Sequence, residues 1–356
     1  MKLLDIYLLR RYLTSLLLSV VGLWLISVIV DLIERIDTFI DFNATPSQML
    51  SYYFFHSPYW IILTLPIATL LGTLFALGNC ARNLEITAMK AAGISLYRIL
   101  APVFACALLF SSLAFLFTDR VVPEATFRYN RILDHIRSHN HGDGSRKQVL
   151  LQDADNQFIF VRSYDAGNQR GHEVSWEWRP HNAVAQRLVA RRMEWRQDRW
   201  LAIGGRLYHF DGERPHSTAF DTLALDRLTL RPADFARQRK KPEEMDYGEL
   251  NTYIERAQAN GEDAARHLVD LHLKISFPFT CFIMVLLGAP LAANARRAGF
   301  ANSFGIGIFI CFAFYSCVKA GQALGWNKLA DPFLAAWLGN IIFVLLSLAL
   351  LWRAHK

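Results

Sequence analysis

Six long apolar stretches constrain the fold of this chain more than any other feature. Three of them precede a long polar block and three follow it, at residues 13–30, 60–77, 99–117, 273–291, 303–324 and 333–352. The length of each stretch is close to that of a helix that crosses about 30 Å of hydrocarbon, which is about 20 residues. A spanning backbone satisfies its own hydrogen bonds only in a helix or a closed barrel. The sequence therefore predicts six transmembrane helices.

Lysine and arginine residues are distributed unequally between the two ends of these helices. The net charge of +7 would also fit a nucleic-acid-binding protein, but the positions of the cations favour a membrane protein of fixed orientation. With the N-terminus in the cytoplasm, the short outer segments carry only Arg35 and Lys328. The short inner segments carry Lys2, Arg10, Arg11, Arg82, Lys90, Arg98, Arg296, Arg297, Arg353 and Lys356. This asymmetry predicts that both termini are cytoplasmic.

The same orientation predicts three parts of the chain. Residues 1–118 would hold helices one to three, with a short cytoplasmic helix at about 82–93. Residues 119–271 would form an extracytoplasmic domain with a helical linker at each end, and residues 272–356 would hold helices four to six. None of the five cysteines lies between Thr118 and His272, so this domain is expected to be stable without disulfides.

The middle of the extracytoplasmic block shows a period of two residues, which is typical of half-buried strands. Phe158, Phe160 and Arg162 alternate with Ile159 and Val161, and the tryptophans Trp176 and Trp178 alternate with polar residues. Turn signals about ten residues apart then favour a β-sandwich or jelly roll over about 145–240. Its tryptophans would form a packed core, or else an apolar interior that holds acyl chains.

The loop after the second helix predicts a short amphipathic helix that ends near Gly93. In one interpretation it is an interfacial helix, where Glu85 complements the helix dipole and pairs with Arg82. In the other it is a coupling helix, and its acidic residue docks into a cytoplasmic partner.

Two sets of charged residues lie near the outer ends of helices, and each set has two interpretations. Four acidic residues after the first apolar stretch share one helix face, namely Asp31, Glu34, Asp37 and Asp41. This face is either a solvated surface or the mouth of a substrate path. Lys319 lies near the outer end of the fifth stretch. Its ammonium group would reach the interface, or it would face an anionic ligand.

The motifs of an enzyme or a nucleotide-binding protein are missing. The sequence has no Gly-x4-Gly-Lys-Ser/Thr loop, so any ATP that drives this protein must be bound, with its magnesium, by another subunit. No Ser/His/Asp or paired-carboxylate arrangement stands out. His135, His139 and His141 form a short histidine tract without a fixed metal-binding motif, so no metal site and no cofactor are predicted in this chain.

At this point the chain resembles the lipopolysaccharide export permeases, the related subunits LptF and LptG. The resemblance rests on Leu4-Asp5-x-Tyr7, on the Glu-x3-Met-x3-Gly loop at 85–93, on the three-plus-three helices around a β-domain, and on the segment 269–274 at the start of helix four. The acidic stripe and the Leu-His-x-Lys sequence of 271–274 are more similar to LptG, whereas a lysine at position 319 occurs in sequences similar to LptF.

The resemblance implies a non-catalytic permease of the bacterial inner membrane that pairs with a sister subunit above a cytoplasmic ATPase dimer. It would extract lipopolysaccharide and pass it, through a periplasmic β jelly roll, to a membrane-anchored jelly-roll bridge protein. Helices one and five would form a lateral gate. The ATPase contact would use Glu85, with Arg82, Met89, Lys90 and Gly93 around it.

The candidate residues for the substrate path are Lys319, Asp31 and Glu34 near the outer ends of the helices, and Trp176 and Phe160, which are expected to face the interior of the β-domain. The chain departs from some relatives because it has no lysine at the outer end of helix one, which leaves Lys319 as the better candidate for the lipid phosphates.

Three other functions compete with this one. A permease for a different lipid would use the same architecture. A secondary transporter would need a buried acidic residue in the membrane for its ion relay, and the six apolar stretches show none. A force-transmitting permease is disfavoured, because its large domain usually follows the first of four helices.

Overall fold

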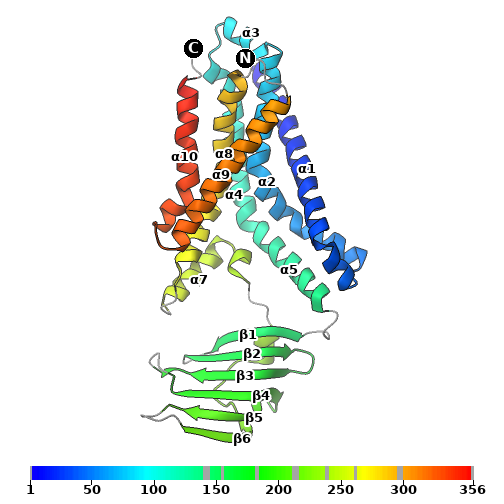
Figure 1. The fold of residues 1–356 in the computed structure, drawn as a ribbon, viewed down its shortest axis with the longest axis vertical. Coiled ribbons are helices and arrows are strands. Elements are labelled where there is room, and N and C mark those ends of the chain that lie inside the picture. Colours follow the sequence, from blue (N-terminus) through cyan, green and yellow to red (C-terminus); the bar gives the residue numbers. More distant parts are fainter. Residues whose placement is uncertain are drawn as a thin grey trace. The chain divides into compact units, whose positions relative to one another are not determined.

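The computed structural model describes residues 2–138, 145–153, 156–180, 184–210, 216–236, 240–259, 263–294 and 300–353. The helices before the polar block are α1 (Lys2–Asp41), α2 (Pro46–Arg82), α3 (Glu85–Ala91), α4 (Leu96–Arg120) and α5 (Val122–Ser138). Six strands follow: β1 (Ser145–Asp153), β2 (Gln157–Asp165), β3 (Arg170–Trp178), β4 (Gln186–Arg196), β5 (Arg199–His209) and β6 (His216–Ala224). The chain then forms α6 (Pro232–Ala236), η2 (Pro242–Glu244), α7 (Tyr247–Ala259), α8 (Ala265–Asn294), α9 (Phe300–Trp326) and α10 (Pro332–Arg353) (Figure 1).

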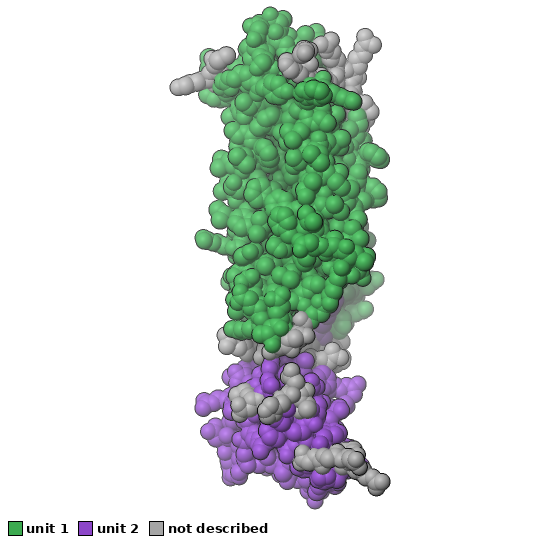
Figure 2. Space-filling view, turned by 90° about the vertical axis from the view of Figure 1, so that its left-hand side faces the viewer, with its two compact units in different colours: residues 1–133, 240–356 green, residues 134–239 purple. Residues whose placement is uncertain are grey.

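The chain divides into two compact units, coloured separately in Figure 2. The helical unit comprises residues 1–133 and 240–356, and the β unit comprises residues 134–239. Most of α5 and all of α7 thus belong to the helical unit. Polar contacts hold them there, because Asp119 accepts a hydrogen bond from the Tyr247 backbone at 2.8 Å and Asn130 donates to Glu244 at 2.6 Å.

Six helices of the described residues are long and apolar enough to cross a membrane, namely α1, α2, α4, α8, α9 and α10. This confirms the predicted number, and each helix contains one of the six apolar stretches. α1 has 40 residues. It is therefore about 60 Å long and extends beyond about 30 Å of hydrocarbon.

The six helices differ in how much of their surface the chain itself covers. In the most apolar 18-residue segment of each helix, 61% of the residues of α2 and 67% of those of α8 are buried. The corresponding values are 17% for α1 and 22% for α9. α8 packs against α2, α4 and α10 and is the centre of the unit. α1 and α9 therefore present the largest uncovered apolar faces among the described helices.

Hydrogen bonds made by polar side chains join several of the membrane helices. Ser111 of α4 donates to the carbonyl of Pro278 in α8 at 2.9 Å. The buried Asn340 donates to the Ser276 carbonyl at 2.6 Å and accepts from Thr280 at 3.1 Å. Such bonds join helices where hydrocarbon offers no partner, and they fix α10 against α8.

The β unit is built on one antiparallel sheet in the order β1-β2-β3-β4-β5-β6. This confirms an inserted all-β domain between the two sets of helices. Each strand pairs with the next one in the chain, which is a meander of hairpins. Strands β4 and β5 form a tight hairpin, with Arg196 opposite Arg199 and a two-residue turn at Gln197 and Asp198, both with positive φ.

One face of this sheet is closed by the chain that follows β6. The buried residues of that face include Ile159, Val161, Val174, Trp176 and Trp200, and they pack with Leu225, Leu228 and Phe235. The Trp200 indole donates to the Leu230 carbonyl at 2.8 Å, and the Tyr164 hydroxyl donates to the Pro232 carbonyl at 3.3 Å. We call residues 225–236 the covering segment.

Candidate functional site

The short helix α3 has well-defined ends. Leu84 precedes it in the left-handed conformation, with φ of 60°. At its other end the Gly93 backbone N–H donates to the Lys90 carbonyl at 3.0 Å, and the Ile94 N–H donates to the Met89 carbonyl at 3.1 Å. This pair of bonds is a Schellman motif, and Gly93 supplies the required positive φ of 82°. The sequence prediction of a helix that ends near Gly93 therefore agrees with the structure.

Glu85, at the start of α3, is the centre of a polar cluster that joins α3 to α1. Its carboxylate accepts a hydrogen bond from the Tyr7 hydroxyl at 3.0 Å and forms an ion pair with Arg11 at 3.0 Å. Asn83 donates to the same carboxylate at 3.3 Å. Arg11 also lies over the Tyr7 ring, 4.7 Å from its centroid. Two side chains of α1 and one from the turn before α3 therefore fix this carboxylate.

These contacts determine the charge of Glu85. Partial burial acts to raise the pKa of its carboxyl group, but the hydrogen bonds from Tyr7 and Asn83 and the charge of Arg11 outweigh that effect. The pKa lies below its ordinary value, so Glu85 is a carboxylate at neutral pH.

The other predicted coupling residues lie around this cluster. A groove with a volume of about 530 Å³ is lined by Leu3, Leu4, Tyr7, Glu85, Ala88 and Met89. Lys90 is half-buried in the last turn of α3, and Gly93 is exposed. The expected partner of Glu85 was wrong, because Arg82 is exposed and Arg11, which lies 74 residues from Glu85, takes that place.

The acidic stripe of α1 does not have one environment. Glu34, Asp37 and Asp41 are exposed, as expected for a solvated face. Asp31 is only 3% exposed. Its carboxylate accepts from the Arg35 Nε at 2.9 Å and from the Tyr52 hydroxyl at 3.4 Å. The interpretation as a solvated surface is therefore wrong for Asp31, which contacts Tyr52 of α2 and pairs with Arg35 of its own helix.

Asp31 also corrects the statement that the membrane helices contain no buried acidic residue. Its ion pair with Arg35, four residues further along the same helix, already satisfies the charge. Asp31 therefore has a structural partner and does not by itself indicate the ion relay of a secondary transporter.

Lys319 is exposed on α9 and takes part in a chain of polar contacts toward α8. Its Nζ donates to Gln322 at 2.9 Å, and the Gln322 amide donates to Asp270 at 3.2 Å. Among the described residues no ion pair joins Lys319 to the acidic stripe of α1, and Asp31 pairs with Arg35 instead. The ammonium group therefore keeps hydrogen-bonding capacity for an anion.

The two aromatic candidates of the β unit lie on opposite faces of the sheet. Trp176 is 5% exposed, and its indole donates to Gln157 at 3.1 Å. Phe160 is 37% exposed and lies opposite Ser175, whereas Ile159 lies opposite Trp176. Grouping Phe160 with the interior was therefore wrong. Its strand neighbour Arg162 shares its face and could have indicated this, because an exposed arginine marks the solvent side of a strand.

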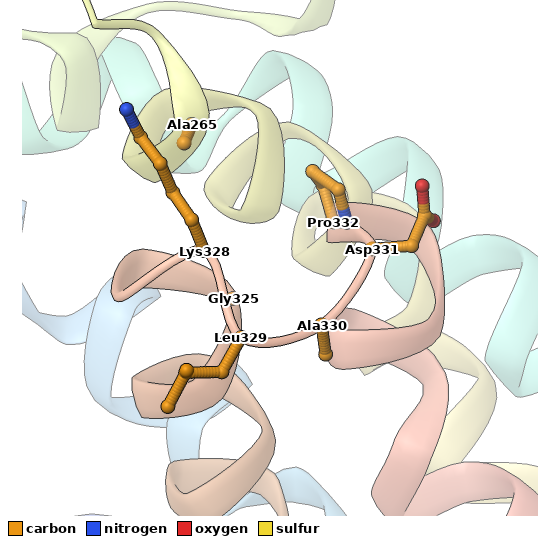
Figure 3. Close-up of a pocket in the computed structure, with 7 residues that line it drawn as sticks. All are labelled: Ala265, Gly325, Lys328, Leu329, Ala330, Asp331 and Pro332. Carbon is orange, nitrogen blue, oxygen red and sulfur yellow. The ribbon is translucent and has the colours of Figure 1, made fainter.

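Other candidate positions carry less chemistry. A hollow of about 340 Å³ lies where α9 turns into α10, and Figure 3 shows Lys328 and Asp331 at its rim. Lys328 pairs with Asp263 at 3.0 Å, and Asp331 accepts a hydrogen bond from the Phe333 backbone N–H at 2.9 Å. Both side chains therefore have structural partners within the chain. Within the described ranges no three metal-ligating side chains come together, and His139 and His141 lie outside those ranges.

Sequence reasoning missed the partners of the key side chains. Tyr7 was noted as part of a motif and Arg11 as a cation near the cytoplasm, but neither was connected with Glu85. The separation along the chain hides this contact. In contrast, the spacing of four residues between Asp31 and Arg35 was a usable signal.

Comparison with known proteins identifies the family. The model of the family "Lipopolysaccharide export system permease LptF/LptG" matches residues 6–353. The permease protein LptF of Escherichia coli K12 is 25% identical, over 97% of this chain and 94% of that protein, and LptF of Shigella flexneri gives the same values. LptG of Escherichia coli K12 is 21% identical over 81% of each chain. The greater likeness to LptG that was expected stays a prediction.

The family match covers nearly the whole chain and agrees with its six apolar helices and inserted sheet. The chain therefore belongs to the LptF/LptG family, and it is a multi-pass, non-catalytic transmembrane permease of the lipopolysaccharide export system in the inner membrane.

Proposed function

We propose that this permease couples a cytoplasmic ATPase to the movement of lipopolysaccharide, with α3 and both chain ends in the cytoplasm and the β unit in the periplasm. The observation that carries this proposal is the Glu85 cluster, which joins a short surface helix to the long helix α1. The first turn of α1 and the last turn of α10 lie at the same end of the helical unit as α3 (Figure 1).

The ATPase would bind ATP and magnesium, and this chain would supply the surface that responds to them. The groove beside α3 is lined by apolar residues and by the Glu85 carboxylate, so it suits a partner that inserts an apolar side chain beside a cation. A movement of the partner would be transmitted to α1, because Glu85 is bound to Tyr7 and Arg11 of that helix.

The family works as a pair of related permeases in the export system. In the present chain the weakly covered helices α1 and α9 suit this contact and would line the lateral gate between the subunits. The edge strands suit the bridge protein. Within the described sheet β1 pairs with β2 and β6 pairs with β5, which leaves one edge of each for strand addition.

Removal of a lipid with several acyl chains from the bilayer costs about 0.8 kcal/mol for each methylene that leaves the hydrocarbon. ATP hydrolysis would supply part of this free energy, and the apolar face of the β unit would return another part. That face is packed under the covering segment. Acyl chains would therefore enter between the sheet and residues 225–236 only when this segment moves aside.

The proposed orientation predicts opposite labelling of two introduced cysteines. Ala92 at the end of α3 and Ser217 in β6 are both exposed, whereas the five native cysteines are buried or half-buried. In intact spheroplasts a membrane-impermeant maleimide should label Ser217→Cys and should label Ala92→Cys only after permeabilisation. The unsubstituted chain gives the background. Labelling of both variants from outside would contradict the orientation.

A second prediction concerns Lys319. A contact between a lysine and a phosphate in a partly desolvated place contributes on the order of 1 to 3 kcal/mol. Lys319→Gln should lower the amount of lipopolysaccharide that copurifies with the complex, and Lys319→Arg should preserve it. If Lys319 only orders Gln322 and Asp270, then Lys319→Gln will change the basal ATPase rate and leave the bound lipid unchanged. Measuring both quantities on one preparation separates these two roles.

A further inference from the structure

A second, separate hollow lies in the helical unit where α4 passes into α5. It has a volume of about 650 Å³. Its apolar wall comes from α1 and α2 and consists of Trp24, Phe54, Phe55, Pro58 and Ile61. The wall is fixed rather than adaptable, because the Trp24 indole donates to Ser57 at 3.0 Å and the Ser57 hydroxyl donates to the Tyr53 carbonyl at 2.6 Å.

The opposite rim of this hollow is charged. Arg120, Glu124 and Arg128 line it from the end of α4 and the first turns of α5. Arg128 pairs with Glu124 at 2.8 Å and lies 5.3 Å from the Phe55 ring centroid. Arg120 is exposed and has no ion pair with any described residue. Two cations and one anion give the rim a net positive charge. The Glu124 carboxylate would repel an anionic ligand, but the two arginines outweigh it.

The position of Arg120 places this charge at the boundary of the membrane. It is the last residue of the membrane-spanning helix α4, and the aromatic wall belongs to helices that cross the same membrane. Anionic groups of lipids lie at that depth, and their acyl chains lie beside the adjoining apolar wall. An arginine that simply extends its side chain to the membrane interface would account for Arg120 by itself. It does not explain an apolar hollow of fixed shape beside the unpaired cation.

The volume restricts the ligand. A water-sized group takes about 30 Å³, and a methylene is of similar size, so the hollow holds on the order of twenty methylenes. That is about one acyl chain, so the hollow suits a lipid that places a single chain against the aromatic wall. We propose that this hollow is a binding site for an anionic glycerophospholipid, with one acyl chain against Trp24, Phe55 and Ile61 and its phosphate on Arg120, with Arg128 beside it. The site is separate from the contact at α3 and does not depend on it.

The test uses the full chain in its complex, reconstituted in nanodiscs of phosphatidylcholine with a small fraction of either phosphatidylglycerol or lipopolysaccharide. Native mass spectrometry then counts the lipids that remain bound. We expect the unsubstituted protein to retain phosphatidylglycerol, and Arg120→Gln to weaken that retention about tenfold, as loss of one desolvated phosphate contact would. Arg120→Lys should keep most of it.

Two further variants make the result specific. Arg131 is an exposed cation of the same helix α5, 5.6 Å from the Phe127 centroid and outside the hollow, so Arg131→Gln is the matched control and should retain phosphatidylglycerol normally. Val121 is 40% exposed at the rim, so Val121→Trp can fill the mouth of the hollow without disturbing the core. This variant should also lose the phospholipid.

Three results would overturn the proposal. They are no phosphatidylglycerol on the unsubstituted protein, equal loss in Arg120→Gln and Arg131→Gln, and Arg120-dependent retention of lipopolysaccharide instead of phosphatidylglycerol. Failure of the α3 contact to bind an ATPase would leave all three measurements unchanged, because the retained phospholipid is counted directly.

Discussion

Replacing Glu85 by alanine is expected to uncouple the ATPase from this permease while the membrane helices stay folded. The substitution removes the acceptor of the Tyr7 hydroxyl and the counter-ion of Arg11, which then lies beside the Cys80 sulfur at 3.5 Å without a carboxylate. Both partners are partly exposed, so we expect each charge-assisted bond to contribute roughly 1 to 2 kcal/mol. Loss of the cluster should weaken association with the ATPase by about ten- to hundredfold.

Co-purification of the ATPase and lipid release from proteoliposomes measure this effect. Asp5→Asn is the matched control, because the Asp5 and Arg98 ion pair lies at the same end of the unit and does not line the groove. The control should retain the ATPase. Normal association and normal lipid release in Glu85→Ala, at equal expression, would reject the coupling role.

Arg11 separates two ways in which Glu85 can act. If Glu85 works only by fixing α3 against α1, then Glu85→Gln, Arg11→Gln and the double variant should lose the same free energy of association. If the Glu85 carboxylate also touches the partner, Arg11→Gln should be the milder change, since the carboxylate is still present. The double-mutant cycle measures the difference directly.

The sequence was sufficient for those features that depend on local composition. Six spans follow from uninterrupted apolar length, and the end of α3 follows from the backbone freedom of Gly93. The partners of Glu85 and Lys319 could not be obtained in this way. They depend on which helices pack together, and α1 and α3 meet only after the membrane helices have assembled.

The sheet shows the same limit. Alternation of apolar and polar residues located the strands, but it does not determine which strands pair, so the meander was not predicted. Alternation also leaves open which face is buried when both faces carry aromatic residues. Packing of the covering segment decided this, because Phe235 covers the face that contains Trp200.

The second large effect is expected in the β unit, where Trp200→Ala should remove much of the folding free energy. Trp200 is fully buried, with the Phe235 centroid at 4.9 Å and the Trp195 centroid at 5.1 Å. Truncation of such a side chain costs about 3 to 5 kcal/mol, and the Leu230 carbonyl loses its donor as well. Domains of this size are stable by only about 5 to 15 kcal/mol.

Limited proteolysis of the full-length chain in detergent can measure this loss, because cleavage within residues 134–239 reports opening of the β unit. Phe160→Ala is the control, since it truncates an aromatic side chain on the exposed face of the same sheet and should cost less than about 1 kcal/mol. Equal protease resistance of Trp200→Ala and the unsubstituted chain would contradict the packing of the covering segment. The Glu85 cluster belongs to the helical unit. Trp200→Ala should therefore stop lipid transfer to the bridge protein while the ATPase still copurifies, which is the reverse of the result expected for Glu85→Ala.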